Sequence, residues 1–155
     1  MEFLLFLTAK EKEILELVYK AGFSVEENTP LCLLGKQYVG FLKKRQKTIV
    51  ICTKNAKVNS GYSLPGPNRE AARYRTAISI KKALRHEATH VAQDCNGSKL
   101  LGILKENQKV HKWYKRTAII DSTSIGSIQE EREAEAYYME DRPTIVISAL
   151  KKYCF

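Results

Sequence analysis

The apolar positions in the first third of the chain predict one helix followed by less regular segments. Apolar residues recur at helical spacing behind a capping-box match at Thr8 and Glu11, which predicts a helix over residues 9–21. Residues 24–30 are polar and predict a loop. Residues 31–42 are apolar but broken by two glycines, so extended segments and a short helix both remain open.

The middle of the chain predicts a strand and then a long helix. Residues 48–53 are rich in β-branched side chains, which favours a strand whose edge can bind an extended peptide. The Gly, Pro and Asn residues of 59–68 predict a loop. Asn68 can cap a following helix that ends near Cys95, either unbroken or bent near Thr76.

The last third predicts two further helices. Residues 102–120 carry no clear pattern, although 117–120 can form a short strand. A second capping-box match begins a helix over residues 128–140. Pro143 can open a final helix that continues over 144–153.

Residues 78–95 contain the motif His86-Glu87-Ala-Thr-His90, which is H-E-x-x-H. On a helix, residues four apart share a face, so both imidazoles can reach one metal ion. Glu87 then lies beside that metal and can accept a proton from a water molecule bound to it. The apolar residues around the motif place it in a helix interior, as this chemistry requires.

Two histidines do not complete a catalytic zinc site, which usually has three protein ligands and an open position. The third histidine, His111, lies 21 residues beyond His90, which is not a compact ligand spacing. The run from Glu130 to Tyr138 begins a predicted helix and carries several carboxylates, so it is the better source of a third ligand.

H-E-x-x-H followed by a helix that bears E-x-x-A-[DE] resembles the gluzincin group of zinc metallopeptidases. The resemblance implies that His86 and His90 are zinc ligands and that Glu87 is the general base. It implies that Glu131 is the third ligand and that Glu135 hydrogen-bonds a ligand histidine. The chain as a whole also resembles small H-E-A-T-H proteins of cyanobacteria and their phages.

One departure from the gluzincin pattern leaves alternatives open. Position 135 is Glu where the family usually has Asp, so Glu130 or Glu133 can replace Glu131 as the ligand. A donor is also needed for the oxyanion that develops during hydrolysis. Tyr138 is the predicted donor, with Tyr137 and His111 as alternatives.

The composition fits a single domain spanning residues 1–155. A chain of 155 residues with 44% apolar residues can bury one core, and no apolar run approaches membrane-spanning length. We therefore expect an α+β fold: a minimal zincin-like domain, mostly helical, with a small sheet before the H-E-x-x-H helix.

The net charge of +9 is unevenly distributed, since residues 31–69 hold eight basic residues and no acidic one. Such a segment can attract nucleic acid, an anionic surface or an acidic protein. No nucleic-acid-binding motif accompanies it, so a solvated basic face is favoured. We expect a peptide or protein substrate and no membrane partner.

The four cysteines are far apart and form no C-x-x-C motif, which argues against a zinc ribbon. The chain begins with an acidic rather than a basic residue pattern, so we expect no signal peptide, a cytoplasmic location and reduced thiols.

The sequence thus predicts a zinc metallopeptidase in which Glu87 is the general base. Two alternatives remain: a zinc-binding domain without activity, and a basic protein associated with nucleic acid. The substrate, the cleavage specificity and the oligomeric state do not follow from the sequence.

Overall fold

The computed structural model describes residues 1–62, 66–104 and 127–155, with side chains from residue 130 onward in the last range. The chain forms five α-helices, two short 3-10 helices and three strands within these residues. In chain order they are η1 Glu2–Phe6, α1 Ala9–Lys20, β1 Ser24–Glu27, η2 Pro30–Leu34, β2 Gly40–Lys43, β3 Thr48–Ile51, α2 Thr53–Asn59, α3 Arg69–Cys95, α5 Ser127–Met139 and α6 Pro143–Cys154.

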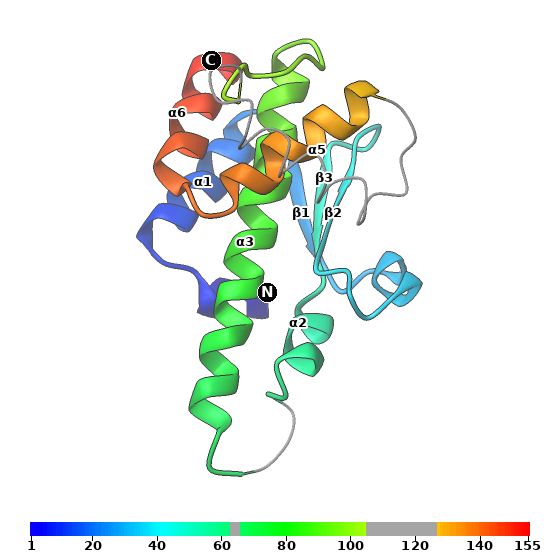
Figure 1. The fold of residues 1–155 in the computed structure, drawn as a ribbon, viewed down its shortest axis with the longest axis vertical. Coiled ribbons are helices and arrows are strands. Elements are labelled where there is room, and N and C mark those ends of the chain that lie inside the picture. The colour runs from blue at the N-terminus through cyan, green and yellow to red at the C-terminus, as the bar shows by residue number, and fades with distance from the viewer. Residues whose placement is uncertain (63–65, 105–126) are drawn as a thin grey trace.

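Helix α3 runs through the molecule and contacts nearly every other element (Figure 1). Helices α1 and α6 pack together against it, the strands β2 and β3 contact it, and α5 crosses it. The residues from His86 to Gln93 are all buried, because elements cover this part of the helix on several sides. Six elements each contribute at least one large, fully buried apolar side chain to the core, such as Phe3, Ile14, Ile49, Ile80, Met139 and Leu150.

The sheet has the strand order β1-β3-β2, so β3 is central. Strand β3 pairs in parallel with β1 and antiparallel with β2. All four residues of β3 are buried, which fits its β-branched composition. The prediction that the 48–53 strand offers a free edge is therefore wrong, and β2 is the edge strand that contacts α3.

The fold class is the one expected, a mostly helical α+β fold with a small sheet before the long helix. Helix α3 is unbroken, and the Thr76 hydroxyl donates to the Ala72 carbonyl within it. The predicted loop at 24–30 is wrong because it contains β1, where only Val25 is buried. The predicted strand at 117–120 and His111 lie outside the described residues.

The expectation of four reduced thiols is also wrong. Cys32 pairs with Cys52, and Cys95 pairs with Cys154, with Cα–Cα distances of 5.6 and 5.1 Å. The second disulfide joins the C-terminal ends of α3 and α6, which are 59 residues apart in sequence. Sequence spacing could not reveal either pair, because pairing depends on how distant segments meet in the fold.

None of the helices in the described part of the chain is both long and apolar enough to cross a membrane.

Candidate metal centre

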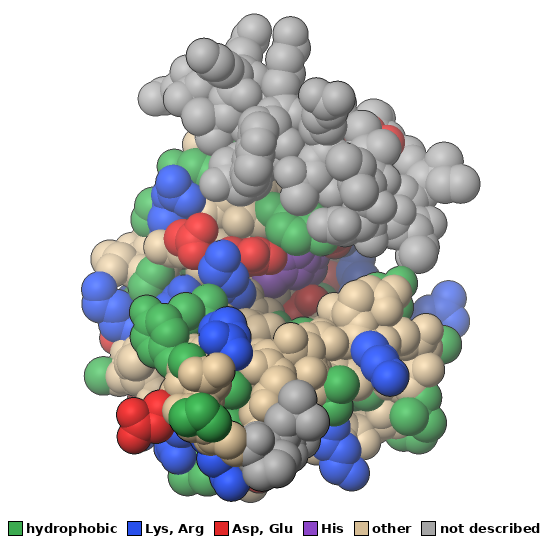
Figure 2. All heavy atoms as spheres, turned by 60° about the horizontal axis from the view of Figure 1, so that its bottom comes forward, with side chains coloured by type: hydrophobic (Ala, Val, Ile, Leu, Met, Phe, Trp, Pro, Cys, Tyr) green, Lys and Arg blue, Asp and Glu red, His purple; other side chains and the backbone are tan. Residues whose placement is uncertain are grey.

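Helix α3 places His86 and His90 on one face, one turn apart. Their ring centroids are 5.0 Å apart, and each residue is 9% exposed. Figure 2 shows histidine side chains inside a recess of the surface, with acidic side chains beside them. The helical placement predicted from the motif is confirmed.

A carboxylate from α5 completes a three-residue cluster. Glu133 places one oxygen 3.1 Å from His86 Nε2 and the other 2.8 Å from His90 Nε2. The candidate ligand atoms of these three residues all lie within 4.8 Å of one another. Two imidazole nitrogens and one carboxylate are a donor set typical of catalytic zinc.

Glu133 occupies the place that the family resemblance assigned to Glu131. Residues two apart on a helix point to different sides, so Glu131 and Glu133 start from different faces of α5. Glu133 was one of the open alternatives, and the structure brings its carboxylate to both histidines.

The other ring nitrogen of each histidine also has a partner. His86 Nδ1 lies 3.0 Å from Glu140 Oε1, and His90 Nδ1 lies 2.8 Å from Gln93 Oε1. A carboxylate only accepts, so the Nδ1 of His86 must carry the proton. Its Nε2 is then directed at Glu133.

The same conclusion for His90 follows from the neighbours of Gln93. The Gln93 Nε2 donates to the Arg132 carbonyl and to Glu135 Oε1, at 3.0 Å each. Both neighbours are acceptors, so the amide NH2 must face them and the amide oxygen must face His90. His90 Nδ1 is therefore the donor, and its Nε2 faces Glu133.

Glu135 is linked to His90 through Gln93. It is 2% exposed, and besides Gln93 it accepts hydrogen bonds from the backbone N–H groups of Leu101 and Gly102, at 3.0 and 2.9 Å. It was predicted to bond a ligand histidine itself, whereas in the structure Gln93 lies between them.

The electrostatics of the cluster favour a cation between the three side chains. Burial alone would lower the pKa of His86, but hydrogen bonds with Glu133 and Glu140 outweigh it and raise this pKa well above its usual range. Burial alone would raise the pKa of Glu133, but bonds with both histidines hold it well below its usual range. With both Nδ1 atoms committed as donors, a proton or a metal ion must separate each Nε2 lone pair from the Glu133 carboxylate.

Glu87 is buried beside the cluster, and burial raises the pKa of its carboxyl. Gly40, the first residue of β2, lies directly against it. A Cβ atom added at Gly40 would come within 3.2 Å of Glu87 Cγ and 3.3 Å of Glu87 Oε1. The edge strand β2 therefore begins at the candidate general base.

A scaffold of buried charge holds the end of α5 near His86. Arg85 on α3 donates to the Glu140 carbonyl at 2.7 Å and pairs with Glu11 of α1. Glu11 is fully buried, and the Thr8 hydroxyl also donates to it. The predicted capping box is thus used differently, because Glu11 reaches the interior rather than the helix end.

A model of one protein family, a domain of unknown function (DUF8637), matches residues 3–155. The chain belongs to the DUF8637 family. The curated proteins and the solved structures contain no match to it. The family assignment therefore names no activity, and the chemistry of this DUF8637 member rests on its own residues.

The two tyrosines on α5 differ in their surroundings in this DUF8637 chain. The ring of Tyr137 packs on His86, with centroids 4.7 Å apart. Tyr138, the predicted oxyanion donor, packs against the core, and the Arg142 guanidinium lies 3.7 Å from its ring centroid. The Tyr137 ring therefore contacts the cluster.

The sequence reading did not identify Gln93 and Glu140. Gln93 lies three residues beyond His90, and Glu140 lies seven residues beyond Glu133, so each shares a helix face with its neighbour in the cluster. That periodicity was available in the sequence, but many other polar residues of the DUF8637 chain have comparable spacings.

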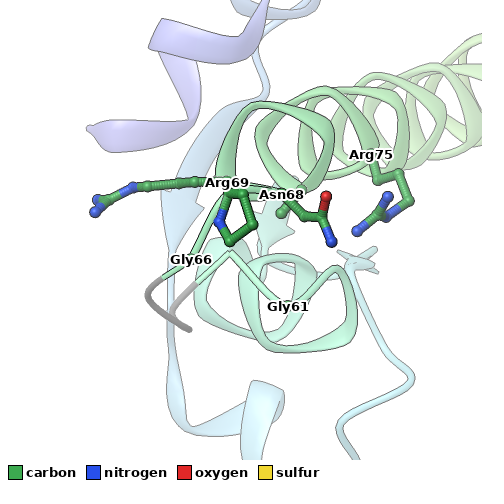
Figure 3. Close-up of a pocket in the computed structure, with 7 residues that line it drawn as sticks. Gly61, Gly66, Asn68, Arg69 and Arg75 are labelled. Atoms are coloured by element: carbon green, nitrogen blue, oxygen red, sulfur yellow. The ribbon is translucent and has the colours of Figure 1, made fainter.

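A separate cavity of about 270 Å³ lies at the other end of α3 (Figure 3). It is lined by Gly61, Gly66, Pro67, Asn68, Arg69, Ala72 and Arg75. Arg75 donates to the Ser60 carbonyl at 3.0 Å, and Arg69 stacks on Tyr62. The cavity lies roughly 25 Å along the helix from the histidines, at about 1.5 Å per residue, so it is not part of the metal centre.

Proposed function

We propose that this chain is a zinc-dependent metallopeptidase, in which His86, His90 and Glu133 hold the metal. The observation that carries the proposal is the convergence of the two Nε2 atoms on the Glu133 carboxylate. Nitrogen and carboxylate donors of this kind suit zinc better than magnesium or calcium, which prefer oxygen.

Zinc bound there would activate a water molecule and polarise the carbonyl of a substrate. Glu87 is placed to accept the proton of that water and to pass it to the departing amine. Burial raises the pKa of its carboxyl toward the operating pH, where one group can both accept and return a proton. For the oxyanion, both Tyr138 and Tyr137 remain candidates, and contact with His86 favours Tyr137.

The sheet supports a peptide substrate. Strand β2 begins against Glu87, and in the described residues it pairs only with β3. An extended peptide can add to such an edge through main-chain hydrogen bonds. A scissile bond near Gly40 would then lie next to the general base.

A zinc-binding domain without activity is the second candidate. It is supported by the low exposure of His86 and His90, 9% each, since a structural zinc site is closed to substrate. The two proposals differ in one variant. Glu87→Gln retains all three candidate ligands and removes only the base.

The experiment measures zinc content and cleavage of a broad peptide library for the unchanged protein and for Glu87→Gln. Metallopeptidase activity predicts stoichiometric zinc in both, and chelator-sensitive cleavage only in the unchanged protein. Zinc in both with cleavage in neither supports the inactive domain. Equal cleavage by both proteins rules out Glu87 as the base.

The two disulfides bear on where the domain acts. The sequence predicted a cytoplasmic location, where thiols are normally kept reduced. The pairs Cys32–Cys52 and Cys95–Cys154 instead support an oxidising compartment. Alkylation of the protein purified from its natural source, without reductant, should then leave all four cysteines unmodified.

A further inference from the structure

The edge strand β2, which begins beside Glu87, leads directly into a turn that is rich in positive charge. After Gly40 the strand β2 continues to Lys43, and residues 43–47 read Lys-Lys-Arg-Gln-Lys before β3 begins. Three residues of a strand span about 10 Å. The first of these charges therefore lies within reach of a peptide residue about three positions from the scissile bond.

Only part of this charge is neutralised by the described residues. Lys43 pairs with Glu26 at 3.1 Å, and Lys44 pairs with Asp94 at 3.5 Å. Arg45 and Lys47 are exposed, and Lys47 lies 5.8 Å from the Phe23 ring rather than in an ion pair. Among the described residues, no carboxylate forms an ion pair with these two side chains of the β2–β3 turn.

The sequence around this turn adds positive charge and no negative charge. No acidic residue occurs between positions 31 and 69, which include β2, β3 and α2. Lysine and arginine side chains are also seen around the recess that holds the histidines (Figure 2). A ligand that follows β2 away from Glu87 therefore moves into a positive potential.

We propose that the substrate is an extended acidic peptide segment, whose Asp or Glu side chains lie over the β2–β3 turn, residues 43–47. This inference rests on the proposed function, because the metal centre determines where the scissile bond lies. Backbone pairing with β2 supplies sequence-independent contacts, and the turn selects the charge. Neutral peptides bind the same edge more weakly.

The test measures peptide binding rather than cleavage, with zinc-loaded Glu87→Gln protein. Two fluorescent decapeptides are compared, identical except that one has Glu and the other Gln at three positions on one side of the centre. Exposed charge pairs each contribute only a few-fold in affinity, so the Glu peptide should bind about three- to tenfold tighter at low salt. This preference should vanish near 1 M salt, where charges are screened within about 3 Å.

Charge reversal locates the effect. The double variant Arg45→Glu, Lys47→Glu should lose or invert the preference for the Glu peptide. The matched control Lys12→Glu, Lys152→Glu makes the same charge change on exposed positions of α1 and α6, and it should retain the preference.

Three results overturn the inference: equal binding of the two peptides, no binding of either, or the same loss in the control variant. The inference is also overturned, in favour of a nucleic-acid partner, if duplex DNA binds more tightly than the Glu peptide and this binding depends on Arg45 and Lys47. Cleavage of the neutral peptide by the unchanged protein is scored separately. The proposed function can therefore stand if the acidic preference fails, and the acidic preference can stand if no cleavage is found.

Discussion

Gln93 offers the sharpest test of how the cluster is organised, because its amide decides which nitrogen of His90 faces the metal position. The variant Gln93→Leu keeps the helix and a side chain of similar volume, but it removes both the amide oxygen and the amide NH2. It deletes the bond to His90 Nδ1 and the bonds to Glu135 and the Arg132 carbonyl. His90 is then free to adopt either tautomer.

The magnitude follows from the groups left behind. Gln93 is fully buried, so His90 Nδ1 and the Arg132 carbonyl lose their partner in an environment that water reaches poorly. Each buried group without a partner costs about 1–3 kcal/mol, so the free energy of unfolding should fall by roughly 2–6 kcal/mol. Zinc affinity should fall about 10- to 100-fold, as for other residues that orient a metal ligand.

The assay combines chelator competition with nitrogen NMR of the histidine rings in zinc-loaded protein, where the metal takes the place of a proton on each Nε2. In the unchanged protein both rings should carry the proton on Nδ1. In Gln93→Leu the His90 signals should shift toward a mixture of forms. His86, which Glu140 holds, serves as the internal reference and should not change.

Loss of stability alone must be separated from loss of orientation. Met139→Ala removes a fully buried side chain of α5 and should cost a similar 2–5 kcal/mol, as Met→Ala changes in cores do. It should leave zinc affinity unchanged. The reasoning is refuted if Gln93→Leu binds zinc as tightly as the unchanged protein while His90 keeps its proton on Nδ1.

Three further predictions concern the ligand set, the buried ion pair and the disulfide. Glu133→Ala should lower zinc affinity by at least about 100-fold whereas Glu131→Ala should leave it within a few-fold, measured by chelator competition; the reverse order would return the ligand to Glu131. Glu11→Gln should cost about 3 kcal/mol or more in urea unfolding at pH 7, because it leaves the partly buried Arg85 guanidinium without its buried carboxylate partner. Burial alone would raise the pKa of Glu11, but hydrogen bonds with Thr8 and Arg85 hold this pKa in the folded state below the ordinary 4.5. The carboxylate therefore stabilises the fold above pH 4.5, and this stabilisation is lost as the pH falls through the folded-state pKa. The cost of Glu11→Gln should shrink in acid, and a pH-independent cost would contradict the assignment. The double change Cys95→Ser, Cys154→Ser opens a 59-residue loop and should cost about 4 kcal/mol by loop-closure entropy, and an unchanged unfolding midpoint would show that this bond adds no stability.

The sequence predicted the parts of this fold that are encoded locally. The helix over 69–95 was predictable because its apolar periodicity and its end signals agree, and it carries His86 and His90 at the spacing that a metal needs. Strand β3 was predictable from its β-branched run. The first helix was predictable from its cap pattern and periodicity, although Glu11 serves a different partner.

The remaining features depend on how elements meet. Four glutamates lie between positions 130 and 135, and only the rotation of α5 against α3 brings Glu133 to the histidines. Strand β1 is short and three of its four residues are polar, so its pairing with β3 creates a strand that its composition does not indicate. The pairing of Cys95 with Cys154 depends on α3 and α6 lying side by side.

Crystals grown with zinc, measured on both sides of the zinc absorption edge, test the central claim most directly. The account predicts one strong anomalous peak about 2.0–2.2 Å from His86 Nε2, His90 Nε2 and a Glu133 oxygen. A zinc-saturated crystal with no peak among these three side chains, or with its main peak on other residues, would contradict the account.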